Sequence, residues 1–313
     1  MWKKEFVDLL YPTDPSKMNI DQAMILKYKN IPSSLFKYTS FSEKGYSILH
    51  KNKILLKTPD KFNDPFDCSL TFAMDPSRDA IHRKCIDNFK DELSESEIEE
   101  LKKSDNPMLD LVKRVTENDP NIKKDQATIF ADTISKSIED EYNEMASRLS
   151  SGLKKGIYIT CFSESKDSIL MWSHYADRHR GFCIEYDFSS LDFHDTTTRL
   201  LYPIIYTDSL FDATEYLQPV FEGGEHNNLM VTYAAITKST EWRYEKEWRY
   251  VLQLGPSNDP PLSVPKPKAI YLGAKVSEGD KENIIELANE MDIKVYQMAM
   301  ETSEFKLIAT DLL

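Results

Sequence analysis

Short segments with alternating apolar and polar residues recur along this chain, and helical patterns separate them in no regular order. The clearest are "LFKYTSF" (35–41), "GIYITCFS" (156–163), "GFCIEYDF" (181–188), "EWRYVLQL" (247–254) and "KVYQMAM" (294–300). A period of two is typical of half-buried β-strands. A regular strand–helix–strand repeat would predict a parallel sheet, and this chain lacks one. We therefore expect an α+β fold built on a mixed, mostly antiparallel sheet.

Other segments complete this prediction. "KILLKT" (53–58), "LLYPIIYT" (200–207) and "AIYLGA" (269–274) are expected to be strands. "VTYAAITKS" (231–239) and "DKENIIELANEMD" (280–292) have helical spacing instead.

The chain divides into an N-terminal helical arm, residues 1–32, and a single α+β domain, residues 33–313. Within that domain, the stretch from about 75 to 152 is charged and has helical spacing, which predicts a helical insertion. Ser94 stands three residues before Glu97, the pattern of a capping box at the start of a helix.

Composition limits the class of protein. Apolar residues make up 41% of the 313 residues, which is typical of a globular chain, and the formal net charge of −13 argues against nucleic-acid binding over the whole surface. The four cysteines form no C-x-x-C pair, and no run of 18 apolar residues occurs. We expect a cytoplasmic protein with no membrane segment.

The segment "TEWRYEKEWRYV" (240–251) concentrates carboxylates and guanidinium groups. If all of it is a strand, Glu245 and Glu247 share one face with Arg243 and Arg249. On an exposed face such a row is a solvated set of ion pairs worth little. In a cleft, it is costly to bury unless it takes part in chemistry.

A metal site has less support. His174 and His179 are five residues apart, and Cys161 and Cys183 flank them at a spacing that does not suit zinc. No resident metal ion is expected.

Four separated motifs together resemble a known family. They are "LFKYTSF" with "NKILLKTPDKFNDPFD", then "ITCFSESKDSILMWSHYADRHRGFCIEYD", then "KSTEWRYEKEWRYV" and finally "AIYLGAKV". Their order resembles the prokaryotic domain-of-unknown-function family 2971, over roughly residues 34–280. Members of that family are associated with phage defence and mobile elements, which implies an effector role.

The same order of motifs is more loosely similar to the ADP-ribosyltransferase fold. That resemblance implies a polar residue on the first strand, here Lys37 or Tyr38, and a Ser/Thr-rich second strand, here Thr160 and Ser163. It also implies a glutamate on a later strand, here Glu245 or Glu247. This chain has no His or Arg at position 38 and no clear Ser-Thr-Ser triplet.

The resemblance implies that NAD is a substrate, with the target a protein or a nucleic acid. The strand glutamate would offset the positive charge of a ribosyl oxocarbenium. Tyr38 or Trp172 would stack on nicotinamide, and basic side chains would bind the pyrophosphate. We assign Glu245, Glu247 and Tyr38 as catalytic. The expected binding residues are Lys37, Thr39, Asn63, Asp64, Asp67, Ser163, Glu164, Trp172, His174, Tyr175, Lys238, Arg243 and Arg249.

Two other hypotheses stay open. A nuclease could hold Mg²⁺ through Asp64, Asp67, Glu245 and Glu247, with Lys238 or Arg249 on a phosphate. Alternatively, the protein is a sensor without catalytic activity that binds a partner through the acidic helices of residues 90–145.

Overall fold

The computed structural model describes residues 2–71, 83, 86–89, 91, 93–104, 106–117, 124–222 and 224–312. In these residues the main sheet has eight strands, in the order β14-β13-β12-β5-β1-β4-β10-β6. They are β1 (Leu35–Thr39), β4 (Ile157–Ser163), β5 (Phe182–Tyr186), β6 (Leu201–Pro203), β10 (Glu247–Gln253), β12 (Ala269–Leu272), β13 (Lys294–Met300) and β14 (Leu307–Asp311).

Neighbouring strands of this sheet run antiparallel, except that β12 and β13 are parallel. The expected α+β fold with a mixed, mostly antiparallel sheet is therefore confirmed. Three small pairs lie beside the sheet: β2 (Lys53–Leu55) with β11 (Pro261–Ser263), β3 (Leu70–Thr71) with β8 (Phe211–Asp212), and β7 (Ile205–Thr207) with β9 (Thr237–Ser239).

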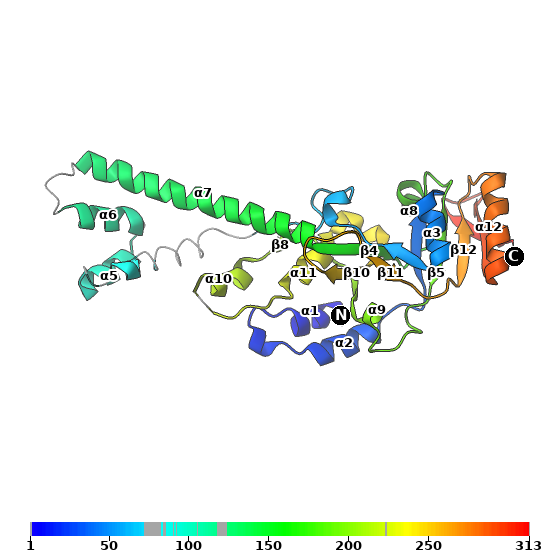
Figure 1. Ribbon diagram of the computed structural model, residues 1–313, viewed down its shortest axis with the longest axis horizontal. Helices are drawn as coiled ribbons and strands as arrows, with labels where there is room; N and C mark the ends of the chain where they lie inside the picture. Colours follow the sequence, from blue (N-terminus) through cyan, green and yellow to red (C-terminus); the bar gives the residue numbers. More distant parts are fainter. Residues whose placement is uncertain are drawn as a thin grey trace.

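The described helices are α1 (Trp2–Leu10), α2 (Ile20–Tyr28), α3 (Glu43–Lys51), α5 (Glu95–Lys102), α6 (Pro107–Glu117), α7 (Lys124–Gly156), α8 (Ile169–Tyr175), α9 (Thr196–Arg199), α10 (Thr214–Glu222), α11 (Met230–Ile236) and α12 (Glu278–Met291), with the 3-10 turns η1 (Pro15–Lys17), η2 (Pro59–Lys61) and η3 (Thr240–Glu245). Helices pack on both faces of the sheet, except α5, α6 and most of α7, which form the projecting insertion (Figure 1).

The alternation of each strand separates three apolar clusters. Trp248 and Tyr250 of β10 pack in a cluster with α3 and α12, whereas Val251 packs on the other face with α1, α10 and α11. On that second face, the β1–β5–β12 part of the sheet is covered by α8, where Trp172 packs against Tyr38. Side chains that alternate on one strand thus reach different layers.

The N-terminal helices pack on the domain. Phe6 and Leu10 are buried in the cluster that includes Ile157 and Ile159 of β4. Trp2 stacks on Trp248, with 6.1 Å between ring centroids. Figure 1 shows α1 and α2 lying alongside the sheet rather than extending away from it.

The helical insertion projects from the domain. In Figure 1, α7 runs outward from the sheet, and α5 and α6 lie toward its far end. The capping box of Ser94 and Glu97 is present at the start of α5. Residues 90, 92, 105 and 118–123 of the predicted acidic segment lie outside the described residues. In the described part of the chain, no helix combines the length and apolarity needed to span a membrane.

Three local predictions were wrong. "LLYPIIYT" forms two strands in different sheets, because Pro203 cannot donate to a ladder and β7 pairs with β9 instead. The last three residues of "VTYAAITKS" form β9, so Lys238 lies on a strand rather than a helix. Glu245 lies in η3 and not on the strand of Glu247.

Candidate functional site: a charged cavity in a split sheet

The main cavity lies at a split between two central strands. β1 is paired with β5 along its length, but it pairs with β4 only at Phe36 and Ser163. Next to this point, Lys37 donates from its ammonium to the Cys161 carbonyl at 3.0 Å and to the Thr160 hydroxyl at 2.8 Å. The Lys37 side chain thus takes the place of a backbone hydrogen bond between β1 and β4. The cavity has a volume of about 950 Å³, in the range of small-molecule sites.

Most of the predicted site residues line this cavity, and four do not. The lining includes Lys37, Tyr38, Thr39, Asn63, Asp67, Ser163, His174, Tyr175, Lys238, Glu245, Glu247 and Arg249. Asp64, Glu164, Trp172 and Arg243 are not part of it.

The four others have different environments. Trp172 is fully buried and donates its indole N–H to the Lys166 carbonyl, so its ring has no face open to a ligand. Glu164 accepts a bond from the Trp248 indole at 2.7 Å. Asp64 accepts from the backbone of its own turn, and Arg243 is exposed.

Tyr38 lines the cavity but packs inward. Its hydroxyl donates to the Ser165 carbonyl at 2.7 Å, and its ring meets Trp172 edge to face at 5.2 Å between centroids. Burial raises the pKa of Tyr38. The phenol is thus a neutral, engaged group, and the proposal below gives it no catalytic role.

Arg249 forms the centre of the cavity floor. The residue is fully buried on β10 and donates from Nε to Glu247 at 2.7 Å. Its two terminal nitrogens each donate to a different oxygen of Asp67 at 2.6 Å, a bidentate arrangement. A further bond to the Ala235 carbonyl, at 2.8 Å, fixes the guanidinium plane. Arg249 therefore links β10 to the loop that follows η2.

Lys238 connects the two glutamates. Its ammonium lies 2.5 Å from Glu245 Oε2 and 2.9 Å from Glu247 Oε2. All three side chains are buried. The short strand β9 positions Lys238 in the floor, next to the two glutamates, so the wrong helix prediction for this segment misplaced a residue of the site.

Lys246 has a left-handed backbone conformation, which directs Glu245 toward the ammonium of Lys238. Lys246, between the two glutamates, has φ 45° and ψ 53°, so the chain turns before β10 begins. The prediction that Glu245 and Glu247 share one strand face is therefore wrong. The turn is held because the Glu164 N–H donates to the Lys246 carbonyl at 3.0 Å and Ser163 Oγ donates to the Glu245 carbonyl at 2.6 Å.

The two glutamates differ in their partners. Both Glu247 oxygens face cations, namely the Arg249 guanidinium and the Lys238 ammonium. Glu245 faces one cation, Lys238, and its other oxygen accepts a bond from the neutral Tyr175 hydroxyl at 2.7 Å. Glu245 is thus the less compensated of the two carboxylates.

Their pKa values move in opposite directions. Burial acts to raise the pKa of Glu247, but the charges of Arg249 and Lys238 outweigh burial and hold that pKa well below its usual range. Burial and then the charge of Glu247 raise the pKa of Glu245. Burial also raises the pKa of Tyr175, so its hydroxyl keeps its proton and donates to Glu245.

The floor therefore contains three carboxylates, Asp67, Glu245 and Glu247, and two cations, Lys238 and Arg249. The sum of these formal charges is −1. Because Glu247 and Asp67 are both bound by Arg249, the surplus negative charge is centred on Glu245. A buried carboxylate with incomplete compensation can stabilise a positive charge that develops beside it.

Another part of the cavity lining, the basic wall, contains Lys37 and Lys57. Lys37 is half-buried and bonds only to neutral oxygens. Burial lowers the pKa of Lys37, and the positive charge of Lys57 acts in the same direction. The negative charge of Glu247 acts to raise the pKa of Lys37. Because Lys37 and Lys57 both line the cavity, an anion bound there would be attracted by two ammonium groups.

Sequence reasoning missed several residues of the site, among them Lys57 and Tyr206. Lys57 belongs to "KILLKT", where alternation with the buried Leu56 could have indicated a side chain on the cavity side. Tyr206, whose hydroxyl accepts a bond from the Glu247 N–H at 2.9 Å, gave no signal in the sequence. It comes from β7, which was predicted as part of a longer strand.

The carboxylates of the floor are engaged by protein cations. A metal ion could bind Asp67 or Glu247 only by displacing Arg249, which has ideal bidentate geometry toward Asp67. Within the described ranges, no set of three or more His, Cys, Asp or Glu side chains is arranged to hold a metal ion.

These features define an α+β protein with a mixed-charge cavity in a split sheet. The model of the family described as "Protein of unknown function (DUF2971)" matches residues 171–250. The match confirms the resemblance to that family over this segment, which contains Tyr175, Lys238, Glu245, Glu247 and Arg249. No curated protein and no solved structure matches the chain.

The opposite pKa shifts predict a characteristic dependence of stability on pH. An unfolded glutamate has a pKa of about 4.3. The stabilisation from Glu247 is complete above that pH and is lost as the pH falls through its lower folded pKa. Glu245 acts with the opposite sign: its contribution is present below about pH 4.3 and is lost as the pH rises through its raised folded pKa.

We expect difference curves of unfolding free energy to separate the two residues. Relative to wild type, Glu247→Gln should remove an increase in the unfolding free energy that accompanies rising pH below about pH 4.3. Glu245→Gln should remove a decrease in the unfolding free energy that accompanies rising pH above about pH 4.3. Urea denaturation across this pH range measures both, and identical curves for the two variants would contradict the assignment.

Proposed function

We propose that this protein is an NAD-cleaving or ADP-ribosyl-transferring effector of the cytoplasm, with its reaction centre at Glu245. The observation that carries the proposal is the juxtaposition, in one cavity, of an incompletely compensated carboxylate and a basic wall. NAD combines an anionic pyrophosphate with a ribosyl bond whose cleavage generates positive charge. The cavity offers a matching group for each.

The two ends of the cavity suggest how NAD is held. Lys37 and Lys57, which both line the cavity, face the pyrophosphate and attract its negative charge. Glu245 faces the ribose of the nicotinamide half. Tyr175 orients Glu245 through their 2.7 Å hydrogen bond, and Asn63 bonds to Tyr175 in turn.

The reaction follows from these positions. The bond between ribose C1′ and the nicotinamide nitrogen breaks, and its electron pair leaves with nicotinamide. Positive charge develops on C1′ and the ring oxygen, and the Glu245 carboxylate offsets it. Water or an acceptor then bonds to C1′ and releases one proton. Glu247 keeps its charge paired with Arg249 and acts as a positioning residue for Lys238.

Nicotinamide release from NAD by the purified protein tests this function. We expect release without added metal and a rise in melting temperature with NAD. Because a ligand specific for the folded state stabilises by RT ln(1 + [L]/Kd), NAD at about 100 times Kd adds about 2.7 kcal/mol.

The same preparation, given Mg²⁺ and DNA or RNA with and without chelator, separates the alternatives. Chelator-sensitive nicking together with no nicotinamide release would overturn the proposal in favour of the nuclease. If neither activity nor stabilisation occurs, the partner-binding sensor becomes the better hypothesis.

A further inference from the structure

A row of lysines extends from the cavity over α3 and β2. Lys53 and Lys57 alternate with the buried residues Ile54 and Leu56, so both ammonium groups lie on the cavity side of the segment. They are four residues apart, or about 13 Å along an extended chain. Lys44 and Lys51, at the two ends of α3, line the same cavity and are exposed.

The outer lysines of this row lack protein counter-ions. Within the described residues, Lys44, Lys51 and Lys53 form no ion pair, whereas Lys61 at the end of the row lies 2.7 Å from Asp259. Among the described residues that line the main cavity, Glu43 is the carboxylate that α3 contributes beside these lysines, and Asp67, Glu245 and Glu247 belong to the floor. In a chain with a formal net charge of −13, an uncompensated basic row is a local exception. It provides an electrostatic path for a polyanion.

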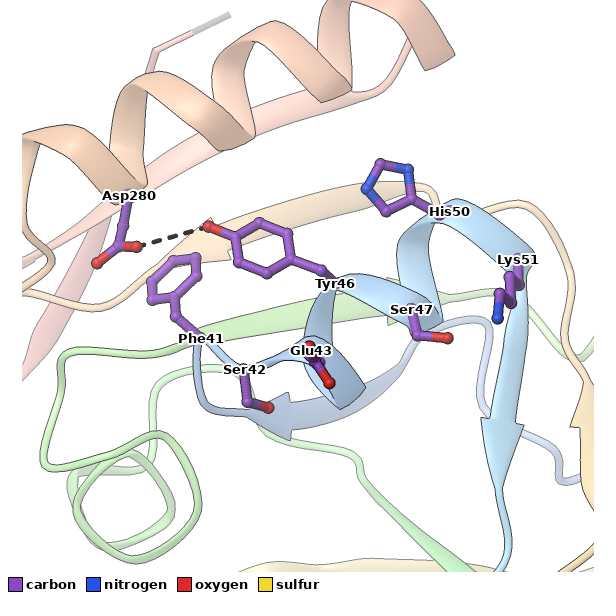
Figure 2. Close-up of a pocket in the computed structure, with 8 residues that line it drawn as sticks. All are labelled: Phe41, Ser42, Glu43, Tyr46, Ser47, His50, Lys51 and Asp280. Atoms are coloured by element: carbon purple, nitrogen blue, oxygen red, sulfur yellow. Dashed lines mark hydrogen bonds between the residues drawn. The ribbon is translucent and has the colours of Figure 1, made fainter.

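A second cavity adjoins the row. Its volume is about 550 Å³, and it shares Glu43, Ser47 and Lys51 of α3 with the main cavity. Figure 2 shows the rings of Phe41 and Tyr46 side by side in it, with the Tyr46 hydroxyl directed at Asp280 of α12. The rings of Phe41 and Tyr46 give this cavity its apolar surface (Figure 2), against which a flat ring can lie, and the other six lining residues are polar or charged.

From this juxtaposition we propose that the acceptor is a single-stranded nucleic acid, whose phosphates follow Lys44, Lys51 and Lys53. One base lies against Phe41 and Tyr46 in the second cavity. The inference rests on the proposed function, because it names the acceptor of the same reaction centre. A basic groove that tracks the backbone beside aromatic side chains is the usual composition of a single-strand binding site. An acidic peptide could use the lysines, but it would have no use for the aromatic cavity.

The bond from C1′ to nicotinamide breaks and its electron pair leaves with nicotinamide. A lone pair on a base nitrogen or a sugar oxygen of the strand forms the new bond to C1′. The proton of that nitrogen or oxygen is released to solvent. The products are the ADP-ribosylated strand, nicotinamide and one proton.

The test compares the variant Lys44→Glu/Lys51→Glu/Lys53→Glu with wild type. Binding of a short fluorescein-labelled oligothymidylate and oligouridylate is followed by anisotropy at several salt concentrations. We expect wild type to bind and the variant to lose affinity by at least about tenfold, with the slope of log affinity against log salt reduced by about 2. The matched control, Lys275→Glu/Lys294→Glu/Lys306→Glu, reverses three exposed charges outside both cavities and should bind as wild type does.

A second variant tests the base position without changing charge. Tyr46→Ala should weaken oligonucleotide binding severalfold, because base–aromatic stacking is lost while the lysine row stays intact. Melting temperatures verify that each variant is folded.

Nicotinamide release from NAD alone, without oligonucleotide, is measured in parallel. If it persists in the lysine variant while oligonucleotide binding is lost, the inference is supported. If wild type releases nicotinamide but binds no oligonucleotide, or binds polyglutamate as tightly, the inference is overturned and the proposed function stands. Equal oligonucleotide binding by wild type and the lysine variant overturns it as well. If NAD is not cleaved, the proposed function fails by itself, whatever the oligonucleotide does.

Discussion

Replacing Arg249 by methionine is expected to destabilise the protein by about 3–5 kcal/mol, the largest single effect on folding that we predict. The guanidinium is fully buried and donates to both oxygens of Asp67 and to Glu247. Methionine fills much of the volume but leaves Asp67 without its cation and Glu247 with only Lys238. Chemical denaturation at neutral pH measures the loss.

The design of this experiment separates charge from packing. In the variant, Glu247 loses the guanidinium charge that holds its pKa low, so protonation of Glu247 at lower pH should recover part of the lost stability. A packing defect would not recover. Arg243→Met is the matched control, because Arg243 is exposed and its replacement should change stability by no more than about 0.5 kcal/mol. A loss below about 1 kcal/mol for Arg249→Met would contradict a structural role for the buried network.

Replacing Glu245 by glutamine is expected to reduce the rate of nicotinamide release by at least about 100-fold, mainly through kcat. Glutamine keeps the size of the side chain and can still accept from the Tyr175 hydroxyl, but it has no charge to offset the oxocarbenium. The floor would then have two carboxylates for two cations. We therefore expect the folded state to be retained.

Two further variants make the result specific. Glu241→Gln removes a carboxylate from the exposed start of η3 and should leave the rate unchanged. Glu247→Gln should lower both stability and rate, because Arg249 and Lys238 each lose a partner. Full activity in Glu245→Gln, combined with inactivity in a still folded Glu247→Gln, would transfer the catalytic role to Glu247.

Much of the fold could be predicted because local patterns and tertiary packing agree. The alternation in residues 157–163 and 182–186 gave β4 and β5, and the capping box of Ser94 correctly began α5. Predictions failed where two short elements follow each other within one or two residues, so that no loop in the sequence separates them. Lys238 follows α11 directly on a strand, and Pro203 ends β6 two residues before β7 begins.

The sequence by itself determined which residue types meet at the site: alternation on β10 places Glu247 and Arg249 on one side and Trp248 on the other. Only the tertiary structure decided that this side is buried, that Asp67 approaches from a loop 182 residues away to pair with Arg249, and that Lys246 turns Glu245 toward Lys238. The physical reason is the range of the forces. Periodicity and capping act within a few residues, whereas compensation of a buried charge depends on partners that are distant in sequence and on the dielectric they create together.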